Sequence, residues 1–179
     1  MLTGQLAVEL AHQHEKTLVV SLEMSPAVTL SRMARQHTGK AVPRDLTRFL
    51  DATGDLYLFD HVGRLTPKEC MAVCRYFAEE LGGKQVFIDS FMMVCTSEEK
   101  LDEQKQMATD LVSLAQDTGL HVHVVAHCRK PSSGDESKPP GKHDLRGAAA
   151  IPDQCHNVIT VWANKPKQEA MLESAPYAP

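Results

Sequence analysis

The 179-residue chain has no apolar run that could cross a bilayer, because its longest runs, such as Val122 to Ala126, are far shorter than the roughly 20 residues of a membrane helix. It opens without the charged, apolar and small-residue segments of a secretory leader, and its five cysteines are an odd number. Secretion and a complete disulfide framework are therefore not expected. We expect a protein of the reducing cytoplasm with no role in a membrane.

Compositional bias is also absent. Hydrophobic residues make up 42% of the chain and charged residues 23%, close to the averages of globular proteins, which argues against disorder and against a fibrous structure. No internal repeat and no second domain boundary is visible in the sequence. We therefore expect residues 1–179 to form a single domain, while composition leaves the function open.

Positive charge is scarce overall but concentrated in one stretch. The net charge of −4 argues against binding of nucleic acid over the whole surface, yet residues 129–147 carry five Lys and Arg against three Asp and Glu. Within this stretch, residues 131–141 contain three prolines and two glycines and have no periodicity, which is typical of a long loop. We predict a mobile basic loop over residues 129–143 that contacts phosphate groups.

Short apolar runs alternate with longer helical patterns, which predicts an α/β fold with a mainly parallel sheet flanked by helices. The runs are rich in Val, Ile, Leu and Phe, as in strands covered on both faces. We predict strands at Leu18–Leu22, Leu56–Asp60, Gln85–Asp89, His121–Ala126 and Val158–Trp162. We predict helices at Leu2–His14, Pro26–His37, Pro67–Leu81 and Glu99–Asp117.

Three of the predicted strands end in an ionisable residue: Glu23, Asp89 and His127. Ligands of open α/β sheets bind outside the carboxyl ends of the strands, so these side chains converge if the strands are parallel neighbours. Each residue also has an ordinary interpretation, because Glu23 suits the start of a loop and His127 suits a structural histidine. Asp89 before Ser90 follows the Walker B pattern, in which a carboxylate holds a magnesium-bound water. Together the three predict a nucleotide-hydrolysis site.

The sequence DLRG at residues 144–147 follows the basic loop. Asp144 suits the cap of a helix start, Arg146 offers a planar fork to phosphate oxygens, and Gly147 lets a backbone N–H approach a phosphate closely. The alternative is an ordinary capped helix with a solvated arginine. The neighbouring basic loop favours the phosphate-binding interpretation.

Histidines and a cysteine near the fourth predicted strand raise a further alternative. His121, His123 and His127 have odd spacings and could share one face of the strand, with Cys128 adjacent. No CxxC accompanies them and Cys128 would point away, so packing is favoured over zinc. Cys128 beside His127 does not indicate a thiol nucleophile, because nucleophile and base usually meet through the fold.

Six motifs occur in a fixed order along the chain: SLEM at 21–24, LYLFD with LTP between 56 and 67, QVFIDS at 85–90, VVAHCRKP at 124–131, DLRG at 144–147 and the NVI near 157. Together they resemble the RecA-like motor domain of hexameric replicative helicases, the DnaB family. The resemblance covers residues 2–165, and its histidine and DLRG forms are closer to phage primase-helicases and mitochondrial Twinkle than to bacterial DnaB.

The resemblance implies a function for each matching residue. Glu23 would be the general base that orients the water attacking ATP, His127 would sense the γ-phosphate, and Asp89 with Ser90 would form the cofactor site, in which Asp89 holds Mg²⁺ through water. Single-stranded DNA would be gripped through its phosphates in the pore of a hexameric ring. The implied DNA-binding residues are Arg129, Lys130, Lys138, Lys142, Arg146 and Gly147. Such a motor would act in the cytoplasm of a bacterial or phage-infected cell.

Two features of the family are not found in these residues. The family's GxxxxGK[ST] loop and the strand before it would precede residue 2, and its arginine finger would follow the predicted strand at Val158–Trp162. We therefore expect a RecA-like P-loop NTPase core without its N-terminal P-loop strand, and little ATP hydrolysis by residues 1–179 alone. A RecA- or KaiC-like ATPase and a non-catalytic DNA-binding or subunit-interaction remnant stay open as alternatives.

Overall fold

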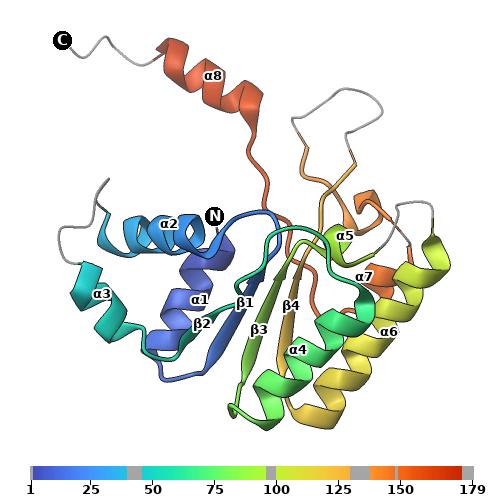
Figure 1. Ribbon diagram of the computed structural model, residues 1–179. Helices are drawn as coiled ribbons and strands as arrows, with labels where there is room; N and C mark the ends of the chain where they lie inside the picture. Colours follow the sequence, from blue (N-terminus) through green and yellow to red (C-terminus); the bar gives the residue numbers. More distant parts are fainter. Residues whose placement is uncertain (1, 40–45, 96–99, 130–137, 148, 175–179) are drawn as a thin grey trace.

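Four parallel strands form the centre of the computed structural model, which describes residues 2–39, 46–95, 100–129, 138–147 and 149–174 (Figure 1). The strands are β1 (Thr17–Ser21), β2 (Leu56–Leu58), β3 (Gln85–Asp89) and β4 (His121–Val125), in the order β2-β1-β3-β4. All three pairings are parallel, which confirms the predicted α/β fold with a parallel sheet. Among the described residues, each helix is too short or too polar to span a bilayer.

The fifth predicted strand is wrong. Residues 158–162 have no strand assignment, and Ile159 and Val161 are 76% and 73% exposed. A strand needs a neighbouring strand to satisfy its backbone, whereas this run pairs with none of the described strands. The Thr160 hydroxyl donates a hydrogen bond to the carbonyl of Pro140 at 3.3 Å, which is a side-chain contact and not a strand pairing. An apolar run alone does not establish that a strand partner exists.

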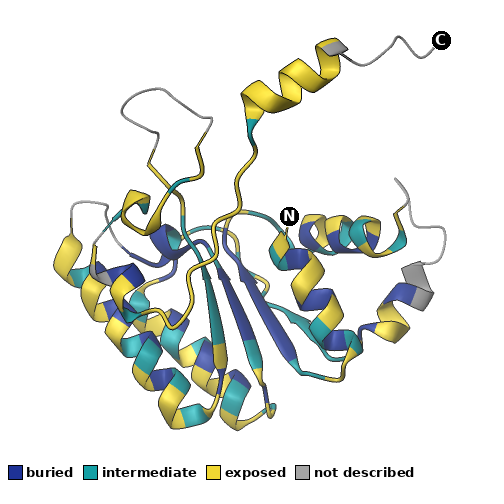
Figure 2. Ribbon diagram, turned by 180° about the vertical axis from the view of Figure 1, so that it is seen from behind, coloured by how far each residue is buried: buried dark blue, intermediate teal, exposed yellow. Residues whose placement is uncertain are grey.

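Helices cover both faces of the sheet. One face packs against α1 (Leu2–His12) and α2 (Pro26–Thr38), where Val8, Met33 and Phe87 share a buried cluster. The other packs against α4 (Pro67–Glu79) and α6 (Leu101–Thr118) through a larger cluster that includes Val20, Ile88, Phe77 and Leu111. Figure 2 shows the central strands as the most continuously buried part of the molecule. Such two-sided burial explains why the strand sequences are almost wholly apolar.

The predicted helices are confirmed with small shifts at their ends. Thr66 caps α4 by accepting from the Glu69 N–H at 3.2 Å, while the Glu69 carboxylate accepts from the Thr66 N–H at 2.8 Å. This reciprocal capping box was readable from Thr66, Pro67 and Glu69. The helix ends at Glu79 rather than at Leu81.

Several short helices were not predicted because they are too short to show a clear apolar period. They are α3 (Leu46–Ala52), α5 (Phe91–Val94), the 3₁₀ turn η1 (Lys142–Asp144), α7 (Ala150–Gln154) and α8 (Lys165–Ser174). The last of these lies apart from the sheet and its flanking helices (Figure 1). Of the predicted loop over residues 129–143, residues 130–137 lie outside the described residues.

Candidate active site

The carboxyl ends of three neighbouring strands meet at one edge of the sheet. Ser21 is paired with Asp89, and Asp89 with Val125, so that each strand reaches this edge in register. Glu23 and His127 follow their strands by two residues, and Asp89 ends its own strand. The convergence that was predicted from the strand ends is therefore present.

Glu23 is held by hydrogen bonds from two directions. The buried hydroxyl of Ser90 donates to Glu23 Oε1 at 2.7 Å, and His127 Nε2 lies 3.4 Å from the same oxygen. The side chains of His127 and Glu23 are 54% and 42% exposed, so both remain accessible to a ligand or to water. The peptide bond between Asp89 and Ser90 is cis.

Asp89 is more buried than Glu23. Burial raises the pKa of the Asp89 carboxyl above its ordinary value, the nearby negative charge of Glu23 raises it further, and His127 acts in the opposite direction. The charges of Glu23 and His127 thus act on the Asp89 carboxyl at this edge. Perturbed carboxyl groups of this kind gather at functional sites.

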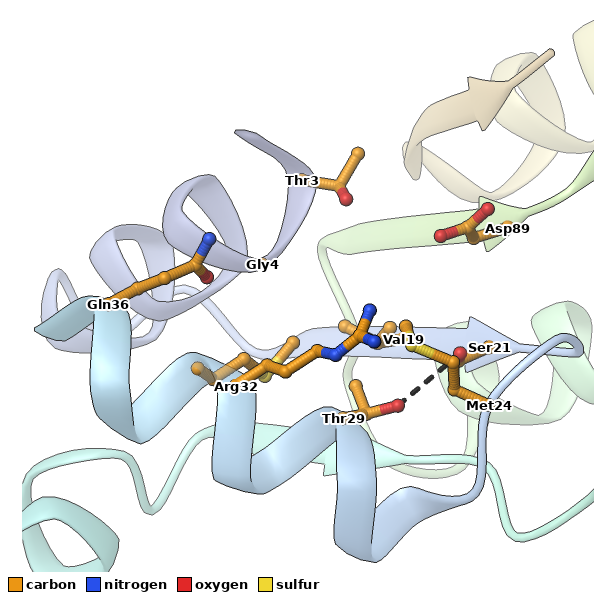
Figure 3. A pocket seen from close by; sticks show the side chains of 10 residues that line it. Thr3, Gly4, Val19, Ser21, Met24, Thr29, Arg32, Gln36 and Asp89 are labelled. Carbon is orange, nitrogen blue, oxygen red and sulfur yellow. Dashed lines mark hydrogen bonds between the residues drawn. The ribbon is translucent and has the colours of Figure 1, made fainter. Parts of the chain in front are cut away.

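A pocket opens beside Asp89, between the first turn of α1, the end of β1 and α2 (Figure 3). The Thr29 hydroxyl donates to the Ser21 hydroxyl at 3.4 Å on its wall, and both residues are buried. The pocket is lined by Thr3, Gly4, Val19, Ser21, Met24, Thr29, Arg32, Met33, Gln36 and Asp89. The N-terminus of α1 and a guanidinium at the same pocket favour an anionic ligand.

Arg32 is a charged lining residue that the sequence did not reveal. Figure 3 shows its guanidinium reaching from α2 toward β1, on the side of the pocket opposite α1. In the sequence it is one of several cations on an amphipathic helix, which is the usual pattern of a solvated face. Only the placement of α2 against the sheet distinguishes it from its neighbours.

The segment after His127 pairs with the DLRG segment. Cys128 and Leu145 form an antiparallel bridge, the Arg146 N–H donates to the His127 carbonyl at 2.8 Å, and the Arg129 N–H donates to the Asp144 carbonyl at 2.7 Å. Asp144 does not cap a helix start as predicted. Its carboxylate instead accepts from the Gly141 N–H at 2.7 Å and closes the 3₁₀ turn η1, and the next helix begins only at Ala150.

The predicted DNA-binding cations have different surroundings. Lys142 is bound to Asp153 at 2.7 Å, and that contact lowers the pKa of the Asp153 carboxyl below its ordinary value. Arg129 donates from Nη2 to the Gly147 carbonyl at 3.3 Å, and Lys138 is exposed. Lys130 lies outside the described residues. The exposed cations of this segment therefore remain candidates, while Lys142 is partly neutralised.

The backbone conformation and close packing at position 147 require a glycine, apart from the predicted role of Gly147 at a phosphate. Its φ is +107°, a conformation that other residues rarely adopt. A Cβ there would lie 2.5 Å from Oε1 of Gln104, which is fully buried on α6. Glycine at this position lets the DLRG backbone lie against α6.

The zinc site considered for the β4 histidines is not assembled among the described residues. His121 stacks on His123 with ring centroids 4.2 Å apart, and His123 stacks on Phe87 at the same distance. His127 faces Glu23 rather than this stack. Packing, the favoured interpretation, accounts for His121 and His123.

The donor groups at the strand edge fit Mg²⁺ and a phosphate ligand. Mg²⁺ prefers oxygen ligands and keeps several waters, and the Asp89 carboxylate at the pocket offers such an anchor. The Glu23 side chain is 42% exposed and therefore accessible to water, as a base for hydrolysis must be.

Comparisons with known proteins agree with this arrangement. A family model described as an AAA domain matches residues 1–133. The chain is similar to a solved structure described as an ATPase domain, with a TM-score of 0.68 and 16% identity over 86% of this chain and 61% of that chain. It is also similar to "The Structure Of A DnaB-Like Replicative Helicase And Its Interactions With Primase", with a TM-score of 0.69 and 17% identity over 86% of this chain and 41% of that one.

The chain thus spans 61% of the length of the first structure and 41% of the length of the second. No curated protein sequence matches it. The family match covers well over half of the residues, and each of the two structural matches covers 86% of this chain. The chain therefore belongs to the AAA domain family and has the RecA-like fold of the ATPase domains of DnaB-like replicative helicases.

Proposed function

We propose that this chain is the motor domain of a replicative DNA helicase of the phage primase-helicase type, which couples ATP hydrolysis to translocation on single-stranded DNA. One observation carries the proposal: the Ser90–Glu23–His127 hydrogen-bonded group lies at the same sheet edge as Asp89 and the pocket beside α1. The fold shared with helicase ATPase domains supports the same conclusion.

In the proposed reaction Glu23 is the general base that orients the attacking water. Ser90 fixes one oxygen of the Glu23 carboxylate, which leaves the other free to accept a proton from water. Asp89 would hold Mg²⁺ through the ion's water ligands, and the ion would supply positive charge against the negative charge of the transferred phosphoryl group. His127, whose Nε2 lies 3.4 Å from Glu23 Oε1, is the proposed sensor of the γ-phosphate.

The proposed coupling to DNA passes through the backbone. The carbonyl of His127 accepts from the Arg146 N–H, so a movement of His127 is transmitted directly to the DLRG segment. Arg146, Gly147, Arg129, Lys130, Lys138 and Lys142 form the proposed contact with the phosphates of single-stranded DNA. Phosphate contacts do not depend on base sequence, as a translocating motor requires.

The proposal includes assembly into a hexameric ring in the cytoplasm of a bacterial or phage-infected cell. It also includes little ATP hydrolysis by residues 1–179 alone, because no GxxxxGK[ST] sequence occurs within them to supply a lysine and backbone cradle for the phosphates. Residues 1–179 preceded by a strand and such a loop, which we call the loop-extended protein, should hydrolyse ATP faster in the presence of single-stranded DNA.

The test compares ATP hydrolysis by the loop-extended protein with and without single-stranded DNA. Glu23→Gln should lower kcat by about 10²-fold or more and leave nucleotide binding in place, since a general base contributes on this scale. Hydrolysis that is unaffected by Glu23→Gln would overturn the assignment of the base. Hydrolysis by residues 1–179 alone at the rate of the loop-extended protein would overturn only the proposed need for the loop.

DNA binding is tested through its salt dependence. Lys138→Gln should weaken binding of single-stranded DNA and reduce the slope of log K against log salt by about 0.7, the value for one phosphate contact. Lys84→Gln is the matched control, because Lys84 is exposed at the opposite edge of the sheet, just before β3. Equal slopes for both variants would contradict the proposed DNA contact. ATP hydrolysis that DNA stimulates without strand displacement would favour a RecA- or KaiC-like ATPase.

A further inference from the structure

Three potential metal ligands meet between α1 and α2, near the C-terminal end of each helix. Glu9 and His12 are one helical turn apart on α1 and share a face, and His37 lies in the last turn of α2. Each offers a ligand atom, and these atoms lie within 4.8 Å of one another. Among the described residues this is the one such group of three His, Cys, Asp or Glu side chains.

His12 carries a second, independent signal. Its Nε2 atom is buried and has no hydrogen-bond partner among the described residues. The ring meets that of His37 edge to face, with centroids 4.6 Å apart. A buried ring nitrogen without a partner costs free energy that a bound ion would recover.

The three ligand atoms lie slightly farther apart than the ligands of a bound zinc ion. Two donors of a tetrahedral zinc, each about 2.0–2.1 Å from the ion, lie about 3.4 Å apart, whereas these atoms are separated by up to 4.8 Å. Glu9 and His37 are exposed, so their side chains can rotate inward while His12 stays in place. Imidazole ligands suit zinc and similar transition metals, and Mg²⁺ prefers a site made of oxygen atoms alone.

We propose that Glu9, His12 and His37 bind a transition-metal ion such as Zn²⁺, with water as the fourth ligand. The ion would fasten the end of α1 to the end of α2. His12 lies nine positions after Thr3 along α1, and this length of helix places it about 14 Å from Thr3 at the pocket. None of Glu9, His12 and His37 lines the pocket beside Asp89, although Gln36, next to His37, does. Because α1 and α2 form two walls of the pocket, a clamp near their C-terminal ends fixes the spacing of those walls.

The test is a calorimetric titration of the unmodified chain with ZnCl₂ in the absence of nucleotide, with MgCl₂ as the comparison. We expect one Zn²⁺ per chain, a rise in Tm, and no comparable effect of Mg²⁺. His37→Gln should weaken Zn²⁺ binding about 100-fold and abolish the rise in Tm, and Glu9→Gln should weaken it less. His14→Gln is the matched control, since His14 lies just beyond α1 and its side chain is 91% exposed.

His37 and Glu9 are exposed, so these two variants are expected to keep the fold, which circular dichroism checks. His12→Gln removes the buried nitrogen, and a folded His12→Gln chain should lose Zn²⁺ binding as His37→Gln does. Absence of Zn²⁺ binding to the unmodified chain overturns the proposal. Binding that persists in the His37→Gln and Glu9→Gln variants also overturns it, and would direct attention to exposed Cys128 or Cys155.

Discussion

The hydroxyl of Ser90 donates a hydrogen bond to Oε1 of Glu23 at 2.7 Å, although the two residues are 67 positions apart in the sequence. Ser90 is 1% exposed, whereas the Glu23 side chain is 42% exposed. A buried donor therefore fixes an accessible carboxylate. We infer from this bond that Ser90 positions the Glu23 carboxylate. The resemblance to helicases had implied a different role for Ser90, as part of the cofactor site with Asp89.

Ser90→Ala tests this positioning in the loop-extended protein. Removal of the hydroxyl frees the Glu23 carboxylate to rotate, so kcat should fall about tenfold, the lower end of the range for partners that orient a site, while KM changes little. Ser113→Ala, an exposed substitution on α6, should leave both constants unchanged. A rise in KM with unchanged kcat would show that Ser90 contributes to ground-state binding instead.

Asp89→Asn should stabilise the fold of residues 1–179 at neutral pH. Burial and the charge of Glu23 raise the pKa of Asp89, so the folded state disfavours its ionised form. Just above the ordinary pKa of an aspartate, the folded chain therefore keeps a proton on Asp89 more readily than the unfolded chain does. At pH 7 the carboxyl is ionised in both states, and its ionisation lowers the free energy of unfolding by the full amount. The neutral amide removes this cost, and we expect a gain of up to about 1 kcal/mol.

Urea unfolding at pH 7 measures the gain. The same substitution should abolish Mg²⁺-dependent ATP hydrolysis in the loop-extended protein, so stability and activity change in opposite directions. Asp60→Asn is the control, because Asp60 is exposed just after β2. A loss of stability in Asp89→Asn would contradict the prediction.

His123 predicts a pH dependence of stability. Burial, and then the neighbouring His121, lower the pKa of His123 to about 4. Between pH 6.5, its ordinary value, and pH 4, the unfolded chain takes up a proton here that the folded chain does not. The free energy of unfolding should therefore fall as the pH drops through this window. From pH 7 to pH 5 we expect this residue to contribute about 1–2 kcal/mol of the loss.

Urea unfolding of His123→Gln at the two pH values checks this contribution. The decrease between pH 7 and pH 5 should be smaller in His123→Gln than in the unmodified chain, because glutamine does not titrate. The His156→Gln variant carries the same substitution at an exposed histidine and should keep the full decrease. An identical decrease in all three proteins would remove His123 as its source.

The strands and the edge at which Glu23, Asp89 and His127 converge could be predicted from the sequence, because both follow from short-range patterns. The run LVVS is apolar on both faces and buried throughout, so its position as β1 was recoverable to within one residue. Glu23, Asp89 and His127 were found because parallel strands of similar length end at one edge.

Other features depend on tertiary placement, which no local pattern encodes. The Ser90–Glu23 bond joins residues from different strand ends, and Arg32 reaches the pocket only because α2 lies against β1. The run at residues 158–162 has the composition of a strand but no described strand beside it. Asp144 looked like a helix cap, yet the backbone bonds from Arg129 and Arg146 place it in a hairpin-like pairing.

Gly147→Ala should destabilise the chain by about 1–3 kcal/mol, the usual cost of holding a non-glycine residue in a disfavoured backbone conformation. The φ of +107° disfavours any Cβ, and that Cβ would lie 2.5 Å from Oε1 of buried Gln104. Gly141→Ala is the matched control in the same segment, because its φ is −86° and its nearest atom would be Asp144 Oδ2 at 3.6 Å. Urea unfolding should separate the two variants.

The same pair of variants bears on the proposed DNA contact. Gly147 accepts a hydrogen bond from Arg129 and follows Arg146, whose N–H is bonded to His127. If strain at Gly147 displaces this segment, Gly147→Ala should weaken binding of single-stranded DNA even under conditions in which the chain is fully folded, while Gly141→Ala should bind normally. Equal DNA affinities in two folded variants would mean that the position of the DLRG backbone does not govern the contact, and side-chain charge alone would then have to account for it.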